Sequence, residues 1–385
     1  MKKAKILFVF GTRPEAIKMA PVIRECAANA DRFLTRICVT AQHRQMLDQV
    51  LDLFDIKPHY DLDLMKDRQS LPELTAHVLL GVTKVLDAEH PDMVLIQGDT
   101  TTTLAAAQAA YYLKIPIAHI EAGLRTHDRF SPFPEEINRR LVSVLSDIHL
   151  APTESAKKNL LAEGLAAAGI HVTGNTVIDA LRMIARRQKT KPSRRRLEEQ
   201  LRRECGPVSG RKKGSKLLLV TGHRRESFGA GFQRICKAIS ILAKNDENLS
   251  IVYPVHLNPN VREPVYAILG GLKNVHLVPP LDYEPFVFLM DHSDLILTDS
   301  GGIQEEAPAL GVPVLVMRDT SERPEGIEAG AARLVGTDVA VIVKETRTLL
   351  AKRFQKTLKA VTPYGDGKAS KRIARILWAY FRRRQ

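Results

Sequence analysis

The sequence predicts an α/β protein built from two doubly wound parallel-sheet domains that face one another across a cleft. Short apolar runs of strand length recur along the 385 residues, and segments with helical spacing separate them. Apolar runs at this spacing indicate parallel strands joined by crossover helices, and two such series follow one another. With 44% hydrophobic residues, the chain can bury two substantial cores.

The first series begins with a buried strand at 5–10 and continues into a helix with Pro14 near its first turn. A helix that starts at Thr153 can end at Gly164. Residues 170–187 read as a strand, a turn and a helix that runs into a basic linker. The other strands of this series are expected at 36–40, 93–97, 115–120 and 147–152.

The second series occupies the other half of the chain, with strands expected at 216–222, 249–255, 274–280, 294–299 and 312–317. We therefore place the domain boundary near residue 175. The predicted parts are an N-terminal domain at 1–175, a C-terminal domain at 176–365 and a terminal helix at 366–385. That helix has apolar residues at helical spacing, so it is expected to pack back on the first domain.

The positive charge is confined to two segments. The formal net charge is +14, but residues 182–216 carry +11 and residues 368–385 carry +7, so the rest of the chain carries −4. Aromatic residues do not alternate with these cations, which favours a solvated linker face over a nucleic-acid groove. We therefore expect no nucleic-acid partner.

The composition also indicates a compartment. No apolar run approaches membrane-spanning length, and the N-terminus turns polar too early for a signal peptide. The four cysteines lack metal-binding or redox spacing, as expected in a reducing cytosol. These features predict a soluble cytoplasmic protein with no metal site.

The most informative motif lies at 299–325. Ser300, Gly301 and Gly302 follow a strand and open a helix, where free N–H groups and close backbone approach favour a phosphate. Glu306, one turn into the helix, can accept both hydroxyls of a ribose, and Arg323 can add a fixed cation. A Gly-Gly turn that only caps a helix is the structural alternative.

Polar residues also follow strands of the first domain. Arg13 and Lys18 come after the first strand, but the GxGxxG fingerprint is missing from the chain, which argues against a bound nicotinamide. Asp99, Glu121 and Glu135 lie in three separate loops and can converge only in the fold. Acids are also common at helix starts, because they cap the helix or interact favourably with its dipole. The functional interpretation of these three acids therefore depends on their convergence in the fold.

Histidines occupy corresponding places in the second domain. His223 and Arg224 follow its first strand, and His256 follows the next one. A single histidine is more often a hydrogen-bonded structural group than a catalyst, but two at strand ends facing a phosphate site favour a functional role.

Taken together, these motifs resemble the non-hydrolysing UDP-N-acetylglucosamine 2-epimerases. The similarity extends in order from about residue 5 to 365, and the basic linker is the main unmatched stretch. The resemblance implies the GT-B architecture, with two Rossmann-like domains around a cleft, and a homodimer. The runs that carry it include GTRPEAIKMAP, GDTTTTLAAA, HIEAGLRT, SPFPEEINRR, TGNTVIDAL, VTGHRRESFG, PVHLNPNVREPV and LTDSGGIQEEAP.

The resemblance implies interconversion of UDP-N-acetylglucosamine and UDP-N-acetylmannosamine for bacterial surface polysaccharides. No cofactor is implied, because the family eliminates UDP to give 2-acetamidoglucal and then re-adds it. Such chemistry needs a base, an acid and cations for the departing diphosphate.

By motif, the family's functional residues fall on three sets of positions. The catalytic set is Asp99, Glu121, Glu135 and His223. The substrate-binding set is Arg13, Lys18, Phe286, Ser300, Gly301, Gly302, Glu306 and Arg323. A second UDP-N-acetylglucosamine that acts as an activator would contact Gln42, His43, Arg44, Arg68, Gln69, Arg224 and His256.

One departure is Leu281, where some relatives carry a polar glutamine near the uracil. It matters for uridine selectivity only if the side chain makes that contact. Three alternatives stay open: a hydrolysing 2-epimerase, a GT-B glycosyltransferase and a non-enzymatic, nucleic-acid-associated protein. Free N-acetylmannosamine, an acceptor requirement and salt-dependent DNA binding would distinguish them.

Overall fold

The computed structural model describes residues 2–40, 44–64, 69–206, 214–321, 323–351 and 362–383. The chain divides into two compact units, of which unit 1 comprises Met1–Ala180 and Tyr364–Gln385 and unit 2 comprises Leu181–Pro363. Each unit is built on one parallel sheet with crossover helices, so the predicted α/β class with two doubly wound sheets is confirmed. The cleft between the two domains stays a prediction.

Among the described residues, unit 1 contains a seven-stranded sheet in the order β3-β2-β1-β4-β5-β6-β7. The chain first builds outward from β1 to β3 and then returns to the other side of β1, which makes the β1–β4 junction a topological switch point. The strands are β1 (Ala4–Phe10), β2 (Phe33–Val39), β3 (Tyr60–Asp61), β4 (Met93–Gln97), β5 (Ile117–Ile120), β6 (Ile148–Ala151) and β7 (Ile170–Val172).

The helices of unit 1 follow the strands in alternation, and several have side-chain caps that define where they begin. Thr12 and Ser70 each form a capping box, and Thr100 and Thr153 cap the next helices. The helices are α1 (Arg13–Ala28), α2 (Arg44–Leu53), α3 (Leu71–Glu89), α4 (Thr101–Tyr112), α5 (Glu135–Leu145), α6 (Glu154–Ala162), the start of α7 (Thr176–Arg187) and α15 (Ala369–Arg382), with a 3-10 turn at Ala167–Gly169.

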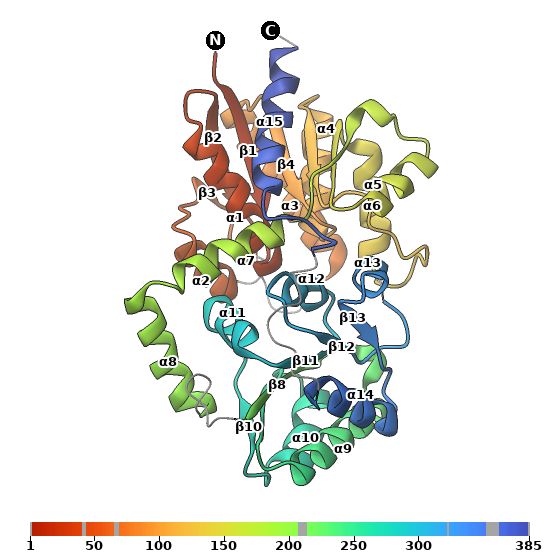
Figure 1. Ribbon diagram of the computed structural model, residues 1–385. Helices are drawn as coiled ribbons and strands as arrows, with labels where there is room; N and C mark the ends of the chain where they lie inside the picture. The colour runs from red at the N-terminus through yellow and green to blue at the C-terminus, as the bar shows by residue number, and fades with distance from the viewer. Residues whose placement is uncertain are drawn as a thin grey trace. The chain divides into compact units, whose positions relative to one another are not determined.

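The terminal helix α15 belongs to unit 1, where it packs along α1 (Figure 1). Ile373, Leu377 and Phe381 form its buried stripe. Trp378, the single tryptophan of the chain, meets Phe33 of β2 edge-on with the ring centroids 5.9 Å apart. The chain end therefore closes the core of the domain in which the chain begins.

In its described part, unit 2 repeats the same plan with a six-stranded sheet in the order β10-β9-β8-β11-β12-β13. Its switch point lies between β8 and β11. The strands are β8 (Lys216–Thr221), β9 (Leu249–Pro254), β10 (Val275–Val278), β11 (Leu295–Thr298), β12 (Val314–Val316) and β13 (Ala332–Leu334). The helices are the remainder of α7, α8 (Lys191–Cys205), α9 (Ala230–Asn245), α10 (Pro259–Leu269), α11 (Tyr283–His292), α12 (Gly301–Ala309), α13 (Pro324–Glu328) and α14 (Val339–Ala351), with a 3-10 turn at Arg225–Ser227.

The prediction of a basic linker at 182–216 is wrong for most of that segment. Residues up to Arg187 belong to α7, and α8 occupies Lys191–Cys205. Three residues spaced four apart in α8, Leu197, Leu201 and Cys205, are buried against unit 2. This apolar stripe is narrow and lies among many cations, so the charge excess concealed a helical pattern.

The cations of α7 and α8 also have specific partners. Arg194 and Arg195 each pair with the glutamate four residues later, as helix geometry favours. Arg187 and Arg196 pair with Glu284, a buried residue in the first turn of α11. Part of the excess positive charge therefore fixes α8 to α11 (Figure 1).

In the described ranges, no helix combines the length and apolar content that a membrane crossing needs.

Asp179 connects α7 to the start of α15, so its loss should loosen the terminal helix. Its carboxylate accepts hydrogen bonds from the backbone N–H groups of Ala369 and Ser370 and from the Ser370 hydroxyl, at 3.1, 2.9 and 2.6 Å. Asp179→Ala is expected to lower the free energy of unfolding by about 2 kcal/mol, because it removes a buried helix cap. Urea unfolding followed by Trp378 fluorescence measures this loss.

The exposed Arg375 on the same helix supplies the control, and Arg375→Ala should change the free energy of unfolding by less than about 0.5 kcal/mol. Equal losses in the free energy of unfolding for the two substitutions would contradict the role of Asp179 as a cap of α15.

Candidate active site

Polar residues gather at the carboxyl ends of the strands on both sides of each switch point. In unit 1 these are the turns after β1 and β4, and in unit 2 the turns after β8 and β11. Ligands of doubly wound sheets bind at such points, so each unit carries a candidate ligand site of its own.

The turn after β1 is fixed by Glu15. Its carboxylate accepts the N–H groups of Gly11 and Thr12 at 2.9 and 2.7 Å, and the hydroxyls of Thr100 and Thr103 at 2.6 and 3.0 Å. Burial raises the pKa of Glu15 although these hydrogen bonds oppose the shift. Glu15 thus ties the turn after β1 to the turn after β4.

Gly11 is required in this turn because the backbone packs tightly. A Cβ atom there would lie 2.1 Å from Thr40 Oγ1 and 2.8 Å from Thr102 Oγ1. A side chain at this position would displace β2 or α4.

Glu121 lies directly after β5 and is 8% exposed. Its backbone is in the left-handed region, with φ at 67°, a conformation that costs energy for a residue with a side chain. Lys18 Nζ contacts both carboxylate oxygens at 2.6 Å, Gln97 donates to Oε2 at 2.5 Å, and Asn175 donates to Oε1 at 3.0 Å. These contacts compensate the burial of a charged group.

Asp99 is connected to the start of α5. Arg139 Nε and Nη2 both lie 2.8 Å from Asp99 Oδ2, and Asn138 donates to the Asp99 carbonyl at 2.9 Å. On its other side, Asp99 follows Gly98, where a Cβ atom would be 3.7 Å from Glu121 Oε2. Asp99 and Glu121 therefore flank the same turn.

The two neighbouring acids of α5 differ in their surroundings. Glu136 accepts the N–H groups of Thr126 and His127 and the Arg139 guanidinium, so it anchors the preceding loop. Glu135 has a buried Oε2 without a hydrogen-bond partner among the described residues. Such an acceptor is costly to bury unless it meets a ligand or water.

The structure thus places Asp99 and Glu121 beside the same turn of unit 1, and Arg139 joins Asp99 to the helix that Glu135 opens. Lys18 lies there too, whereas Arg13 opens α1 directly after the turn that follows β1.

In unit 2 the turn after β8 is fixed by Asp299, which is fully buried at the end of β11. Asp299 Oδ2 accepts the N–H groups of His223 and Arg224 at 2.7 and 2.8 Å. Gly222 is needed beside it, since a Cβ there would lie 3.1 Å from the Tyr253 hydroxyl. Asp299 therefore sets the position of His223.

The His223 ring lies between two partners. Its Nδ1 is 3.3 Å from Asp299 Oδ1, and its ring stacks on His256 with centroids 5.6 Å apart. Burial lowers the pKa of His223, and the Asp299 carboxylate offsets part of that shift. The Asp299 carboxylate therefore partly opposes the effect of burial on the pKa of the His223 imidazole.

The predicted nucleotide motif forms the start of α12. Ser300 is its N-cap residue, and Gly301 and Gly302 open the helix, so their N–H groups face the switch point. Glu306 is 8% exposed and accepts a hydrogen bond from the Tyr283 hydroxyl at 2.7 Å.

Arg323 is not an isolated cation, because its guanidinium is paired with Glu305. Its N–H also donates to Ser321 Oγ at 3.0 Å, and the Ser321 hydroxyl donates to Gln304 at 2.6 Å. The pair with Glu305 compensates part of the charge of Arg323. Together, these contacts hold the segment before α13 against α12.

Phe286 lies half-buried in the first turn of α11. Leu281, two residues before that helix, is 8% exposed.

The predicted activator positions are only partly visible. Gln42, His43 and Arg68 lie outside the described residues, as does the side chain of Arg44 at the start of α2. Gln69 contacts His77 Nδ1 at 2.8 Å. In unit 2, Arg224 and His256 lie beside His223.

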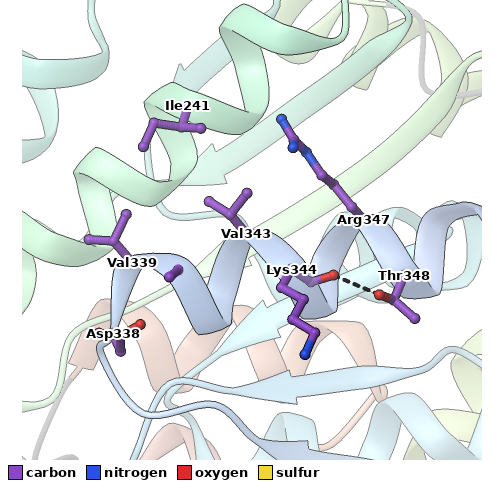
Figure 2. A pocket seen from close by; sticks show the side chains of 8 residues that line it. Ile241, Asp338, Val339, Val343, Lys344, Arg347 and Thr348 are labelled. Carbon is purple, nitrogen blue, oxygen red and sulfur yellow. Dashed lines mark hydrogen bonds between the residues drawn. The ribbon is translucent and has the colours of Figure 1, made fainter.

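A separate hollow with a volume of about 730 Å³ lies between α9 and α14 (Figure 2). It is lined by Ile241 of α9 and by residues of α14 that include Val339, Val343, Lys344 and Arg347. It contains none of the predicted site residues. Among the residues that the structure describes, no group of three or more His, Cys, Asp or Glu side chains is arranged to hold a metal ion.

Sequence reasoning missed several residues that position the predicted ones, among them Glu15, Gln97, Arg139, Asn175, Tyr283 and Asp299. Glu15, Arg139, Asn175 and Asp299 lie within the motifs that carry the family resemblance, so proximity in sequence was the available signal. Asn175 and Tyr283 contact residues 54 and 23 positions away, and nothing in a single sequence reveals such contacts.

Known proteins resemble this chain over nearly its full length. A family profile described as UDP-N-acetylglucosamine 2-epimerase matches residues 24–378. The UDP-N-acetylglucosamine 2-epimerase of Escherichia coli K12 is 54% identical over 97% of this chain and 98% of its own. The Neisseria meningitidis UDP-GlcNAc 2-epimerase bound to UDP-GlcNAc has a TM-score of 0.90 at 50% identity, covering 97% of this chain and 99% of its own.

A more distant structure, the Methanocaldococcus jannaschii UDP-GlcNAc 2-epimerase in complex with UDP-GlcNAc and UDP, has a TM-score of 0.80 at 34% identity and covers 97% of this chain and 99% of that chain. Together with the two doubly wound sheets, these matches define an enzyme of the GT-B-like α/β class. The chain belongs to the UDP-N-acetylglucosamine 2-epimerase family. The predicted family and the prediction of an enzyme are confirmed.

The contact between Asp299 and His223 leads to a prediction about the imidazole. Asp299→Asn removes the carboxylate that raises the pKa of His223, while the burial that lowers it remains, so the pKa is expected to fall further. NMR titration of ring-labelled protein measures the shift, with the signal assigned from His223→Gln.

Glu226, whose carboxylate pairs with Arg318 and is half exposed, serves as the control. Glu226→Gln should leave the titration of His223 unchanged, and an unchanged titration in Asp299→Asn would contradict the assignment.

Proposed function

We propose that the protein interconverts UDP-N-acetylglucosamine and UDP-N-acetylmannosamine by the non-hydrolysing route. The observation that carries this proposal is that Asp99 and Glu121 flank one turn of unit 1 and Arg139 joins Asp99 to the helix that Glu135 opens, in a chain half identical to a structure bound to UDP-GlcNAc. One switch point carries acid–base groups, and the other carries a helix start suited to a diphosphate.

The reaction follows from the chemistry of the substrate. A base removes the proton at sugar C2, its bonding electrons form the C1–C2 double bond, and UDP departs with the electrons of the C1–O bond. The intermediate is 2-acetamidoglucal. UDP oxygen then attacks C1 while an acid delivers a proton to the opposite face of C2. Atoms and charge balance without any oxidant.

The carboxylates are assigned to the proton transfers and to stabilising the positive charge that develops at C1. Glu135 supports this role with an acceptor atom that is buried and unpartnered within the described part of the chain. Glu121 is held by three donors from other segments. Which carboxylate acts on which face is left open.

The nucleotide is assigned to unit 2. The N–H groups at Ser300, Gly301 and Gly302 suit the diphosphate, and Glu306 suits the ribose hydroxyls. Phe286 would stack near the uracil. His223, together with Arg13, would stabilise the departing UDP, and Lys18 would hold the charge balance of the site beside Glu121.

The setting of the reaction belongs to the same proposal. The four cysteines are free and buried, and burial raises the pKa of Cys26 to about 12, which suits unreactive thiols in a reducing compartment. We therefore assign the enzyme to the cytoplasm, where it supplies mannosamine units for surface polysaccharides. A second UDP-N-acetylglucosamine is assigned as an activator, as the family resemblance implies.

The enzyme is further proposed to form a homodimer through unit 1. Helices α3, α4 and α5 pack side by side in sequence order. They expose large apolar side chains, namely Leu80, Tyr111, Tyr112, Leu141 and Val144, between 47% and 77%. Several such residues on adjacent helices favour an interface over solvent.

Proton NMR with UDP-N-acetylglucosamine in deuterated water, without added cofactor, tests the function. Loss of the C2 proton signal as UDP-N-acetylmannosamine forms is the expected result. Accumulation of free UDP and N-acetylmannosamine would establish the hydrolysing reaction instead. No change, even at substrate concentrations that fill an activator site, would overturn the proposed activity.

Amide substitutions test the carboxylates one by one. Asp99→Asn, Glu121→Gln and Glu135→Gln are each expected to lower kcat by at least about 100-fold, because an amide cannot exchange the proton. UDP affinity, measured by calorimetry, should change less than about threefold, since the nucleotide is assigned to unit 2. Wild-type turnover in any variant would remove that residue from the mechanism.

The proposed interface is tested with Val144→Asp, which places a charge on the most exposed of these side chains, 77% accessible. Sedimentation should show a dimer for the wild type and a monomer for the variant. Val341→Asp, on the exposed surface of α14, is the matched control and should leave the dimer intact. A monomeric wild type would contradict the proposal.

A further inference from the structure

Glu121 is a buried carboxylate, and one of its hydrogen-bond donors has no assigned role. Asn175 follows β7 and donates from Nδ2 to Glu121 Oε1 at 3.0 Å. It is 2% exposed. The contact spans 54 positions of sequence, so it exists only in the folded domain.

Asn175 is held at both ends of its side-chain amide and at its backbone. Besides the bond from Nδ2 to Glu121, its Oδ1 accepts the N–H group of Val177 at 3.1 Å, and its backbone N–H donates to the Tyr364 carbonyl at 2.6 Å. Because the oxygen is engaged with an N–H group, the nitrogen is the atom that must face Glu121. The direction of this hydrogen bond is thus set by the network.

The other donors to Glu121 are less constrained by their own chemistry. Lys18 carries a long flexible chain, and Gln97 has one more rotatable bond than asparagine. Asn175 is short, buried and bonded at its backbone and at both ends of its amide. It is therefore the donor best placed to fix where Oε1 points.

We propose that Asn175 is a positioning residue that holds the Glu121 carboxylate in its working orientation, an inference that rests on the proposed function. It also lies where the chain passes between the two units. Helix α7, which begins next to it, continues beyond Ala180 into unit 2, and Tyr364 is the first residue after the chain returns. Through the side chain and the backbone of this one residue, Glu121 is thus connected to both passages.

A structural role offers the simpler explanation, because Asn175 also caps the first turn of α7. Asn175→Asp separates the two roles. The aspartate keeps the oxygen that accepts the Val177 N–H group and leaves the backbone bond to Tyr364 unchanged. The aspartate lacks only the N–H donor of asparagine. Its carboxylate then faces the carboxylate of Glu121, and the two negative charges repel each other.

The expected result for Asn175→Asp is a fall in kcat of at least about 100-fold with KM and UDP affinity within about threefold of wild type. The matched control is Asn159→Asp, which makes the same change in an amide that donates to the Gly123 carbonyl at 2.9 Å in a neighbouring turn. That variant should keep kcat within about threefold of wild type.

A double-mutant cycle provides a readout that does not depend on activity. In the pair E121Q and N175D, the donor and acceptor are exchanged, so an amide at 121 can donate to a carboxylate at 175. Unfolding midpoints of the wild type, both single variants and the double variant should show that the combined loss is smaller than the sum of the separate losses.

The outcomes separate the inference from the function on which it rests. A wild type that is inert toward UDP-N-acetylglucosamine would overturn the proposed function, and the stability cycle would still test the contact. An active wild type with near-normal kcat in N175D would overturn the inference alone. Additive unfolding losses in the cycle would overturn it as well, even if N175D is too unstable to assay.

Discussion

The burial of one carboxylate, that of Glu121, constrains most of the functional part of unit 1. A charge removed from water is tolerated only if donors replace the lost hydration. Here the donors come from α1, from β4 and from the turn after β7, as Lys18, Gln97 and Asn175. The three segments that carry these donors must therefore be positioned around the end of β5. The same contacts compensate the energetic cost of the left-handed backbone conformation of Glu121.

Both units use a buried carboxylate to hold the turn after their first strand. In unit 1, Glu15 reaches back from α1 to the N–H groups of Gly11 and Thr12. In unit 2, the neighbouring strand supplies Asp299, which accepts the N–H groups of His223 and Arg224. The turns are thus rigid before any ligand arrives, and this preorganisation limits the cost of aligning reacting groups.

The sequence predicted the strands well and the basic segment poorly. Parallel strands buried on both faces are continuous apolar runs, so β1, β4, β8 and β11 stand out directly. Helix α8 buries only Leu197, Leu201 and Cys205 on one narrow stripe, and its cations dominate the composition. The partners of the cations were also hidden in the sequence, because Glu284, which pairs with Arg187 of α7 and Arg196 of α8, is 88 residues from Arg196.

By itself, the sequence determined the two alternating series of strands and helices, the family and the candidate residues, because each of these is written in local pattern and motif. The tertiary structure alone decided which of those residues meet. It paired Arg139 with Asp99, left an oxygen of Glu135 buried and unpartnered among the described residues, and compensated Arg323 with Glu305. Such contacts depend on how sheet order and crossover geometry bring distant loops to the same strand ends, and a linear pattern does not contain that information.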